Sequence, residues 1–285
     1  MSSILTDDLY QFLQSLFFLN DVNKRVYWLY LLSGFIIIIA FNWKNKSKLR
    51  QIFTATFSRT YWFNHSCYTD YKWIVINQFL NVMLFIHVLA SGITISLAFN
   101  RLLINMFGDG NFLHWQHHNV LIVFSLVLFI CDDFSRFWLH RLYHRMLWRF
   151  HSVHHSATVL TPLTLYRVHS IEFLLNNCRG IIVVGTVSGL FMYCFKGAIG
   201  VYEVLGVNLF NLIFNLAAAN LRHSHVWVGF GYLEHIFISP AQHQIHHSRE
   251  VKHFNKNYGS CLSIWDKAFS SWLDSKNNKV TRFGL

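Results

Sequence analysis

The sequence holds little charge, little proline and no obvious linker. Only 13% of its 285 residues are Asp, Glu, Lys or Arg and 53% are hydrophobic, whereas charged residues make up about 25% of an ordinary soluble domain. The prolines are Pro162 and Pro240, and no repeat or low-complexity tract divides the chain. The composition therefore excludes a typical soluble globular protein and predicts one integrated membrane protein.

Acidic residues are scarce too, at 13 against 24 Lys and Arg, which gives a formal net charge of +11. The basic residues gather beside apolar runs, at 44–50 and 136–149. Positive charge in such places is typical of cytoplasmic segments next to a membrane, which explains the excess better than a nucleic-acid partner does. We therefore expect no nucleic acid to bind.

Several metal and redox motifs are absent. The five cysteines are scattered and none forms a Cys-x-x-Cys pair, so we expect reduced thiols that pack in the interior. No His-Glu-x-x-His occurs, so the usual general base of a zinc hydrolase is missing. The full Glu and Glu-x-x-His set of soluble di-iron bundles is missing as well. Any metal must be held by another set of side chains.

Two apolar runs predict membrane spans in an N-terminal transmembrane region, residues 1–118. Residues 26–43 are nearly uninterrupted by polar side chains, and Trp28 and Trp43 lie near their ends, where indoles favour the membrane interface. Residues 73–99 are longer and include Asn and Gln side chains that suit a face turned toward protein. No signal peptide is expected, because polar residues interrupt the first apolar stretch and no basic segment precedes it.

A catalytic domain is predicted over residues 119–275, followed by a tail at 276–285. The domain begins with a span near 120–139 that should continue as a helix into the cytoplasm. Residues 180–219 are mostly apolar and are broken near Lys196, which predicts a hairpin of two membrane segments, either crossing or re-entrant.

The distribution of positive charge predicts the topology. Residues 44–59 are richer in Lys and Arg than the segment before the first span, which places this tract in the cytoplasm and the N-terminus outside. Two further spans and the hairpin then leave residues 140–170 and 221–285 on the cytoplasmic side. These two regions can therefore meet.

Histidine is the residue present in unusual number, at 18. Three short boxes repeat the spacing of one helix face, with rings four apart or at positions i, i+3 and i+4. The boxed residues are His140, His144, His151, His154, His155, His243, His246 and His247. So many buried imidazoles would be costly without a cation, and they exceed what one ion accepts, so we predict a dinuclear metal site. Isolated histidines such as His65, His87 and His253 are interpreted as ordinary polar residues.

Imidazole suits iron, copper and zinc alike, so the ligand type leaves the metal open. The boxes and their surroundings, however, resemble the fatty acid hydroxylase superfamily, the sterol desaturase-like integral-membrane enzymes, over roughly residues 115–275. The matching stretches are DFSRFWLHRLYH at 133–144, LWRFHSVHHS at 147–156, RVHSIE at 167–172, SPAQHQIHH at 239–247, NYG at 257–259 and WDKAF at 265–269.

The resemblance implies an all-α fold, a multi-pass transmembrane helical bundle with a cytoplasmic histidine-rich helical cap that holds a dinuclear metal site. It also implies a non-haem di-iron centre that uses O2 as co-substrate to hydroxylate or desaturate a lipid, such as a sterol or fatty acyl chain. The eight boxed histidines then become iron ligands, and His223 becomes a ninth. Differences at Ser170, His225 and residues 270–271 leave the substrate subfamily open.

Only one of His223 and His225 should face the metals, because residues two apart on a helix point about 200° away from each other. A non-helical turn would let both face inward. We expect His223 to be the ligand, since it follows the membrane hairpin directly and the superfamily places an isolated histidine there.

Asp133 is the candidate catalytic carboxylate. It lies seven residues before His140, two helical turns away, and is expected on the same face, where it would accept the free N–H of an imidazole. Weaker candidates for such contacts are Glu172, Asn257 and Asp266. The basic face of Arg141, Arg145 and Arg149 is expected to contact lipid headgroups.

The expected partners are the lipid substrate, the membrane and a separate electron-donor protein, cytochrome b5-like or ferredoxin-like. The donor should be separate because no His-Pro-Gly-Gly haem-binding sequence occurs in the chain. The alternative function is a histidine-rich membrane protein that binds or transports metal, and a zinc-dependent membrane hydrolase comes third. A transporter predicts ligands at the bilayer midplane, whereas these boxes lie in Arg-rich sequence next to the spans.

Overall fold

The computed structural model describes residues 20, 24–110, 113, 115–195, 209–217 and 219–285, apart from the side chains of residues 85–90, 209 and 211. These residues form helices and loops, and their only β-structure is two isolated bridges, Phe237 with Leu262 and Ser248 with Phe283. The predicted helical fold is therefore confirmed. The α-helices are α2 (Trp28–Asn42), α3 (Lys46–Thr56), α4 (Arg59–Trp62), α5 (His65–Phe107), α6 (His117–Met146), α7 (Trp148–His155), α8 (Ser170–Cys194), α10 (Leu209–Leu216), α11 (Pro240–His246) and α12 (Ile264–Ala268). Short 3-10 helices are η2 (Pro162–Tyr166), η3 (Ala219–Arg222), η4 (Gly231–His235) and η5 (Val251–His253).

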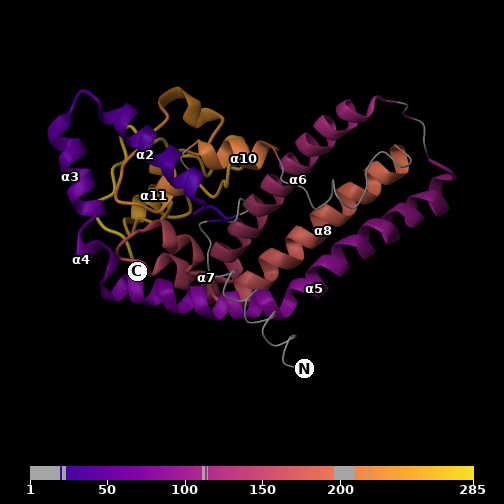
Figure 1. Ribbon diagram of the computed structural model, residues 1–285, viewed down its shortest axis with the longest axis horizontal. Coiled ribbons are helices and arrows are strands. Elements are labelled where there is room, and N and C mark those ends of the chain that lie inside the picture. The colour runs from indigo at the N-terminus through magenta and orange to yellow at the C-terminus, as the bar shows by residue number, and fades with distance from the viewer. Residues whose placement is uncertain (1–19, 21–23, 111–112, 114, 196–208, 218) are drawn as a thin grey trace.

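Three long helices, α5, α6 and α8, extend together to one side of the molecule, and the remaining elements gather at the opposite end (Figure 1). The helices α6 and α8 share an apolar core of buried side chains. These are Val120, Phe124, Val187, Phe191 and Phe195. At its other end α6 reaches the gathered elements, so its last turns lie next to α7 and the C-terminal loops.

The short helices at that end are tied to the N-terminal region by a second apolar cluster. Ile38 of α2 and Ile52 of α3 pack against Leu221, Val226 and Val228, which follow α10 in the chain. This packing holds the segment around η3 in place. All five cysteines are free thiols, as predicted, but only Cys67 and Cys261 are buried and Cys178 is exposed, so interior packing does not hold for all of them.

The helices α5 and α8 approach each other closely through two glycines spaced four apart. A β-carbon at Gly189 would lie 2.6 Å from the carbonyl oxygen of Ser96, and one at Gly185 would lie 2.5 Å from Cγ2 of Ile95. Small residues at this spacing let two helix backbones come together, a common device in membrane helices.

Replacing Gly189 by alanine should therefore lower the stability of the protein by about 1–3 kcal/mol, because the added methyl must push α5 away. The midpoint of thermal unfolding in detergent measures this loss. Gly180→Ala is the matched control, since its β-carbon would meet nothing within 4 Å in the same helix. Equal stability of the two variants would contradict close packing at Gly189.

Among the described helices, α8 alone is long and apolar enough to be a candidate membrane span, and α2 is a shorter apolar helix of 15 residues. The spans predicted near 73–99 and 120–139 lie inside α5 and α6. The multi-pass arrangement and its cytoplasmic cap therefore remain predictions.

The predicted hairpin at 180–219 is described at its two ends. Its first segment lies within α8, which begins at Ser170 and has Glu172 in its first turn. Its second segment includes α10, while the break near Lys196 lies outside the described residues.

Candidate metal centre

Local helical geometry places the three boxes. His140 and His144 lie one turn apart near the end of α6, and the second box forms most of α7. In the third box, His243 and His246 lie on α11 and His247 directly follows it. This helix starts with a capping box, in which the Ser239 hydroxyl accepts from the Gln242 N–H and the Gln242 side chain accepts from the Ser239 N–H. Pro240 at the first position reinforces this start, because its fixed φ suits a helix.

All nine histidines predicted as ligands meet at one place, where they form two groups of side chains. The ligand nitrogens within each group lie within 4.8 Å of one another. The first group consists of His140, His144, His151, His155 and His246. The second group consists of His154, His223, His243 and His247, and all four are buried.

Backbone carbonyls fix the protonation of several rings. The Nδ1 of His140 lies 2.8 Å from the carbonyl of Tyr258, and that of His246 lies 2.8 Å from the carbonyl of Lys256. A carbonyl only accepts hydrogen bonds, so Nδ1 carries the proton in each neutral ring and Nε2 keeps its lone pair. In the second group, His154 makes the same contact to the carbonyl of Arg167 at 3.2 Å.

The Nε2 atoms converge at distances that suit shared coordination. In the first group, the Nε2 atoms of His140 and His151 are 3.1 Å apart, and those of His144 and His246 are 3.2 Å apart. Two nitrogens at about 2.1 Å from one ion would be roughly 3.0–3.4 Å apart for octahedral to tetrahedral angles. Two lone pairs facing each other at this distance repel unless a cation lies between them, so the residues fit a metal ion.

The second group shows the same pattern around one ring. The Nε2 of His223 lies 3.1 Å from that of His247, 3.1 Å from that of His243 and 3.3 Å from that of His154. The geometry of each group therefore fits one ion.

Burial keeps the imidazoles neutral. Loss of solvation lowers the pKa of His140 to about 4 and that of His154 to about 3. Burial, followed by the charges of neighbouring imidazoles, holds the pKa of His223, His243 and His247 well below the usual value. At neutral pH the rings are free of the extra proton that would compete with a metal.

A carboxylate orients one ring of the first group, and it is Glu172. Its Oε1 accepts a hydrogen bond from the Nδ1 of His151 at 3.0 Å, and both side chains are buried. Glu172 lies in the first turn of α8, so this contact fixes α8 against α7. Burial raises the pKa of Glu172 to about 8, and its Oε1, as an acceptor for Nδ1, holds the Nε2 of His151 toward the other rings of the first group.

Asp133 does not make the contact that its spacing predicts. Its oxygens accept hydrogen bonds from the N–H of Cys261 at 2.7 Å, the N–H of Leu262 at 3.0 Å and the indole N–H of Trp265 at 3.0 Å. The reason is distance along the helix, because seven residues rise about 10.5 Å, farther than a carboxylate can reach. Asp133 instead holds the C-terminal loop onto α6.

Asn257 and Asp266 act on the site through the backbone. Asp266 accepts from the N–H groups of Tyr258 and Gly259, and Asn257 adopts a left-handed conformation with φ of 56°. Together they shape the loop whose Tyr258 carbonyl binds His140. Neither side chain is within the histidine groups. No side-chain pattern in the sequence marks a backbone carbonyl as a partner, so this role of Tyr258 is apparent only in the structure.

His223 and His225 separate as predicted, although both follow η3 in a loop. The Nε2 of His225 lies 3.3 Å from the carbonyl of Ile52 and 3.4 Å from the Thr56 hydroxyl, and its ring packs against Tyr61. His225 therefore anchors α3.

The isolated histidines lie outside both groups wherever their side chains are described. His65 is exposed, and His253 contacts the Ser248 hydroxyl at 2.9 Å. The side chain of His87 lies outside the described residues.

The three arginines expected on one basic face near the end of α6 have different surroundings in the structure. Arg141 donates to the carbonyl of Phe269 at 3.0 Å and lies over the rings of Trp138 and Phe269, so it fixes the C-terminal segment instead of facing headgroups. Arg145 and Arg149 are exposed. The headgroup contact predicted for all three arginines thus remains a prediction for these two.

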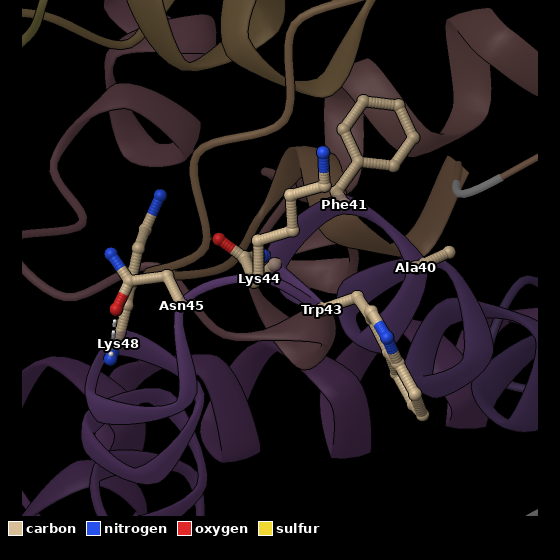
Figure 2. Close-up of a pocket in the computed structure, with 7 residues that line it drawn as sticks. Ala40, Phe41, Trp43, Lys44, Asn45 and Lys48 are labelled. Atoms are coloured by element: carbon tan, nitrogen blue, oxygen red, sulfur yellow. Dashed lines mark hydrogen bonds between the residues drawn. The ribbon is translucent and has the colours of Figure 1, made fainter.

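A surface pocket of about 630 Å³ lies where α2 turns into α3 (Figure 2). It is lined by residues 40–45 and Lys48, and Trp43 is 71% exposed beside it. It contains no histidine or acid, so it is not the reaction site. The exposed indole and the two lysines suit a membrane interface.

Comparison with known proteins gives consistent results. Residues 125–271 match the family model described as Fatty acid hydroxylase. The chain is 28% identical over 159 residues to alkylglycerol monooxygenase from Homo sapiens and 29% identical over 170 residues to ornithine lipid hydroxylase from Rhizobium tropici. It is 25% identical over 174 residues to a very-long-chain aldehyde decarbonylase from Oryza sativa subsp. japonica.

These alignments cover 55%, 58% and 58% of this chain but only 32%, 46% and 25% of the respective relatives. The aligned region is therefore less than half of each relative. No solved structure matches the chain significantly.

Proposed function

The chain belongs to the fatty acid hydroxylase family, as its histidine boxes predicted, and on that premise we propose that it is a membrane-bound, lipid-modifying oxygenase with a non-haem di-iron centre. The observation that carries the proposal is the convergence of the Nε2 atoms of nine imidazoles in two groups. The names of the relatives favour a lipid substrate, and they include hydroxylases as well as a decarbonylase.

Iron held by the two groups would supply the oxidising power that dioxygen needs to attack a lipid C–H bond, by hydroxylation or desaturation. The protein prepares the site in three ways. The carbonyls of Tyr258, Lys256 and Arg167 hold rings in the tautomer that leaves Nε2 free. Glu172 orients His151. Burial of the second group excludes water from the reacting region.

A membrane location is supported by outward-facing apolar side chains on the long helices. On α6, Ile122 is 58% exposed, and on α8, Ile182 is 54% exposed. Such contiguous apolar surface is costly in water and suits lipid. The histidine groups lie beyond the predicted span of α6, which favours a site at the membrane surface on the cytoplasmic side.

Metal transport is the alternative from another class. Moving an ion across a membrane needs ligands that release it, whereas several of these rings are fixed by backbone hydrogen bonds and are closely surrounded by other imidazoles. A rigid site of this kind suits catalysis better. The family of the chain favours the same conclusion.

Purified protein should contain close to two irons per chain, and product formation should require both dioxygen and a separate electron donor, cytochrome b5-like or ferredoxin-like. Two irons are expected because each of the two histidine groups fits one ion. Metal analysis gives the stoichiometry, and labelled dioxygen with lipid mass spectrometry detects oxygen transfer or desaturation in a strain that expresses the protein. A single zinc with activity that needs no oxygen would contradict the proposal.

A further inference from the structure

Two arginines meet at one aromatic ring next to the second histidine group. The guanidinium of Arg222 lies 4.5 Å from the centre of the Phe214 ring on α10, and that of Arg25, just before α2, lies 6.0 Å from it. Arg222 ends η3 and directly precedes His223. Arg222 is therefore adjacent in the chain to a residue of the candidate metal centre and contacts α10 through Phe214.

Arg222 is buried, and no counter-charge contacts it among the described residues. It is 1% exposed, its Nη2 donates to the carbonyl of Ile238 at 3.2 Å, and its Nε has no partner. None of the ion pairs among the described residues includes Arg222 or Arg25. A buried guanidinium without a charged partner is costly, and an anion that paired with it would offset this cost.

Asp132 and Asp133 are the acidic side chains that interact electrostatically with Arg25 and Arg222, and both already accept hydrogen bonds from other groups. Asp133 accepts three hydrogen bonds from the C-terminal loop. Asp132 pairs with Arg136 and Arg179, at 2.7 Å in each case. Among the described residues, therefore, no acidic side chain pairs with Arg222 or Arg25.

We propose, on the basis of the proposed function, that Arg222 and Arg25 bind the anionic group of the lipid substrate, a carboxylate or a phosphate. A planar guanidinium matches both groups with paired, charge-assisted hydrogen bonds. Phe214 and the apolar faces of α10 and α2 form the adjacent surface for the alkyl chain. Because Arg222 is the residue before His223, the carbon that is oxidised lies close to the anionic group and not at the far end of the chain.

The test measures binding without turnover. Iron-loaded, full-length protein in neutral detergent and without oxygen is titrated with dodecyl phosphate, dodecanoate, dodecanol and inorganic phosphate. The two anionic amphiphiles should bind about 10- to 100-fold more tightly than dodecanol, the range expected for hydrogen bonds to a charged group. Inorganic phosphate should bind weakly, because it lacks the alkyl chain.

Arg222→Gln should abolish the preference for the anionic amphiphiles, and Arg25→Gln should reduce it. Arg222→Lys keeps the charge but loses the planar fork, so it should give an intermediate result. Arg282→Gln is the matched control, since Arg282 is exposed and far along the chain in the C-terminal tail. If Arg222→Gln does not fold, the lysine variant and Arg25→Gln still test the proposal.

Three results would overturn it: equal binding of dodecanol and dodecanoate, an anionic preference that survives in Arg222→Gln, or inorganic phosphate that binds as tightly as dodecyl phosphate. The last result would show a site for a free anion. Failure of the oxygenase proposal would instead appear in the metal content and oxygen dependence, while the binding preference could remain.

Discussion

The variant His223→Ala should lose product formation and most of its bound iron, whereas His225→Ala should keep both. His223 contributes an Nε2 that lies within 3.3 Å of three other ligand nitrogens in the second group. Its loss should lower metal affinity by more than the roughly 10- to 100-fold that loss of an outer partner costs. Iron content and turnover of the purified variants measure the difference.

The control is informative because His225 is two residues away and also contacts other elements. Removing its contacts to Ile52 and Tyr61 should lower stability by about 0.5–1.5 kcal/mol without affecting iron. Both variants should still insert into the membrane, which fractionation checks. Loss of iron in His225→Ala with retention in His223→Ala would show that the roles of the two rings are reversed.

The structure divides each triplet of histidines between the two groups, whereas the spacing predicted all three rings on one helix face. Within each box, the two histidines four residues apart fall in the same group; in the two triplets these are His151 with His155 and His243 with His247. The remaining ring of each triplet, His154 or His246, falls in the other group. Rings four apart lie nearly above one another on a helix, whereas a ring three apart is turned aside. Each triplet can therefore serve both ions.

Contacts between distant elements could not be predicted in this way. The partner of His151 is Glu172, which reaches it only because α8 packs against α7. Asp133 lies on the same face of α6 as His140 but too far along the helix to reach it, and it contacts Cys261 instead. Arg222 gave no signal beyond its position next to His223, because burial of a charge depends on tertiary packing.

The ends of the long helices could not be predicted from hydropathy either. α5 runs without a break from His65 to Phe107, far past the predicted span on both sides. Helical hydrogen bonding continues through polar residues when their side chains find partners, as Asp70 does with Thr164 and Arg167. An apolar run therefore shows where a helix lies but not where it begins and ends.

Replacing Glu172 by alanine should weaken iron binding by roughly 10- to 100-fold, the usual cost of removing a carboxylate that orients a metal-binding histidine. The Nδ1 of His151 would lose its acceptor at 3.0 Å, and the ring would be free to turn away from the first group. Glu172→Gln should be milder, because its amide oxygen can still accept from Nδ1. Competition with a chelator measures iron affinity independently of turnover.

Asp133→Asn separates this role from a purely structural one. Asp133 holds the N–H groups of Cys261 and Leu262, so its replacement should lower the midpoint of thermal unfolding. Below that midpoint, iron affinity should stay close to that of the unmodified protein, because Asp133 contacts no ligand histidine. The Glu172 variant is thus expected to change mainly the iron affinity, and the Asp133 variant mainly the thermal stability. If Glu172→Ala bound iron normally and only unfolded earlier, Glu172 would be a packing residue and His151 would be held by its neighbours alone.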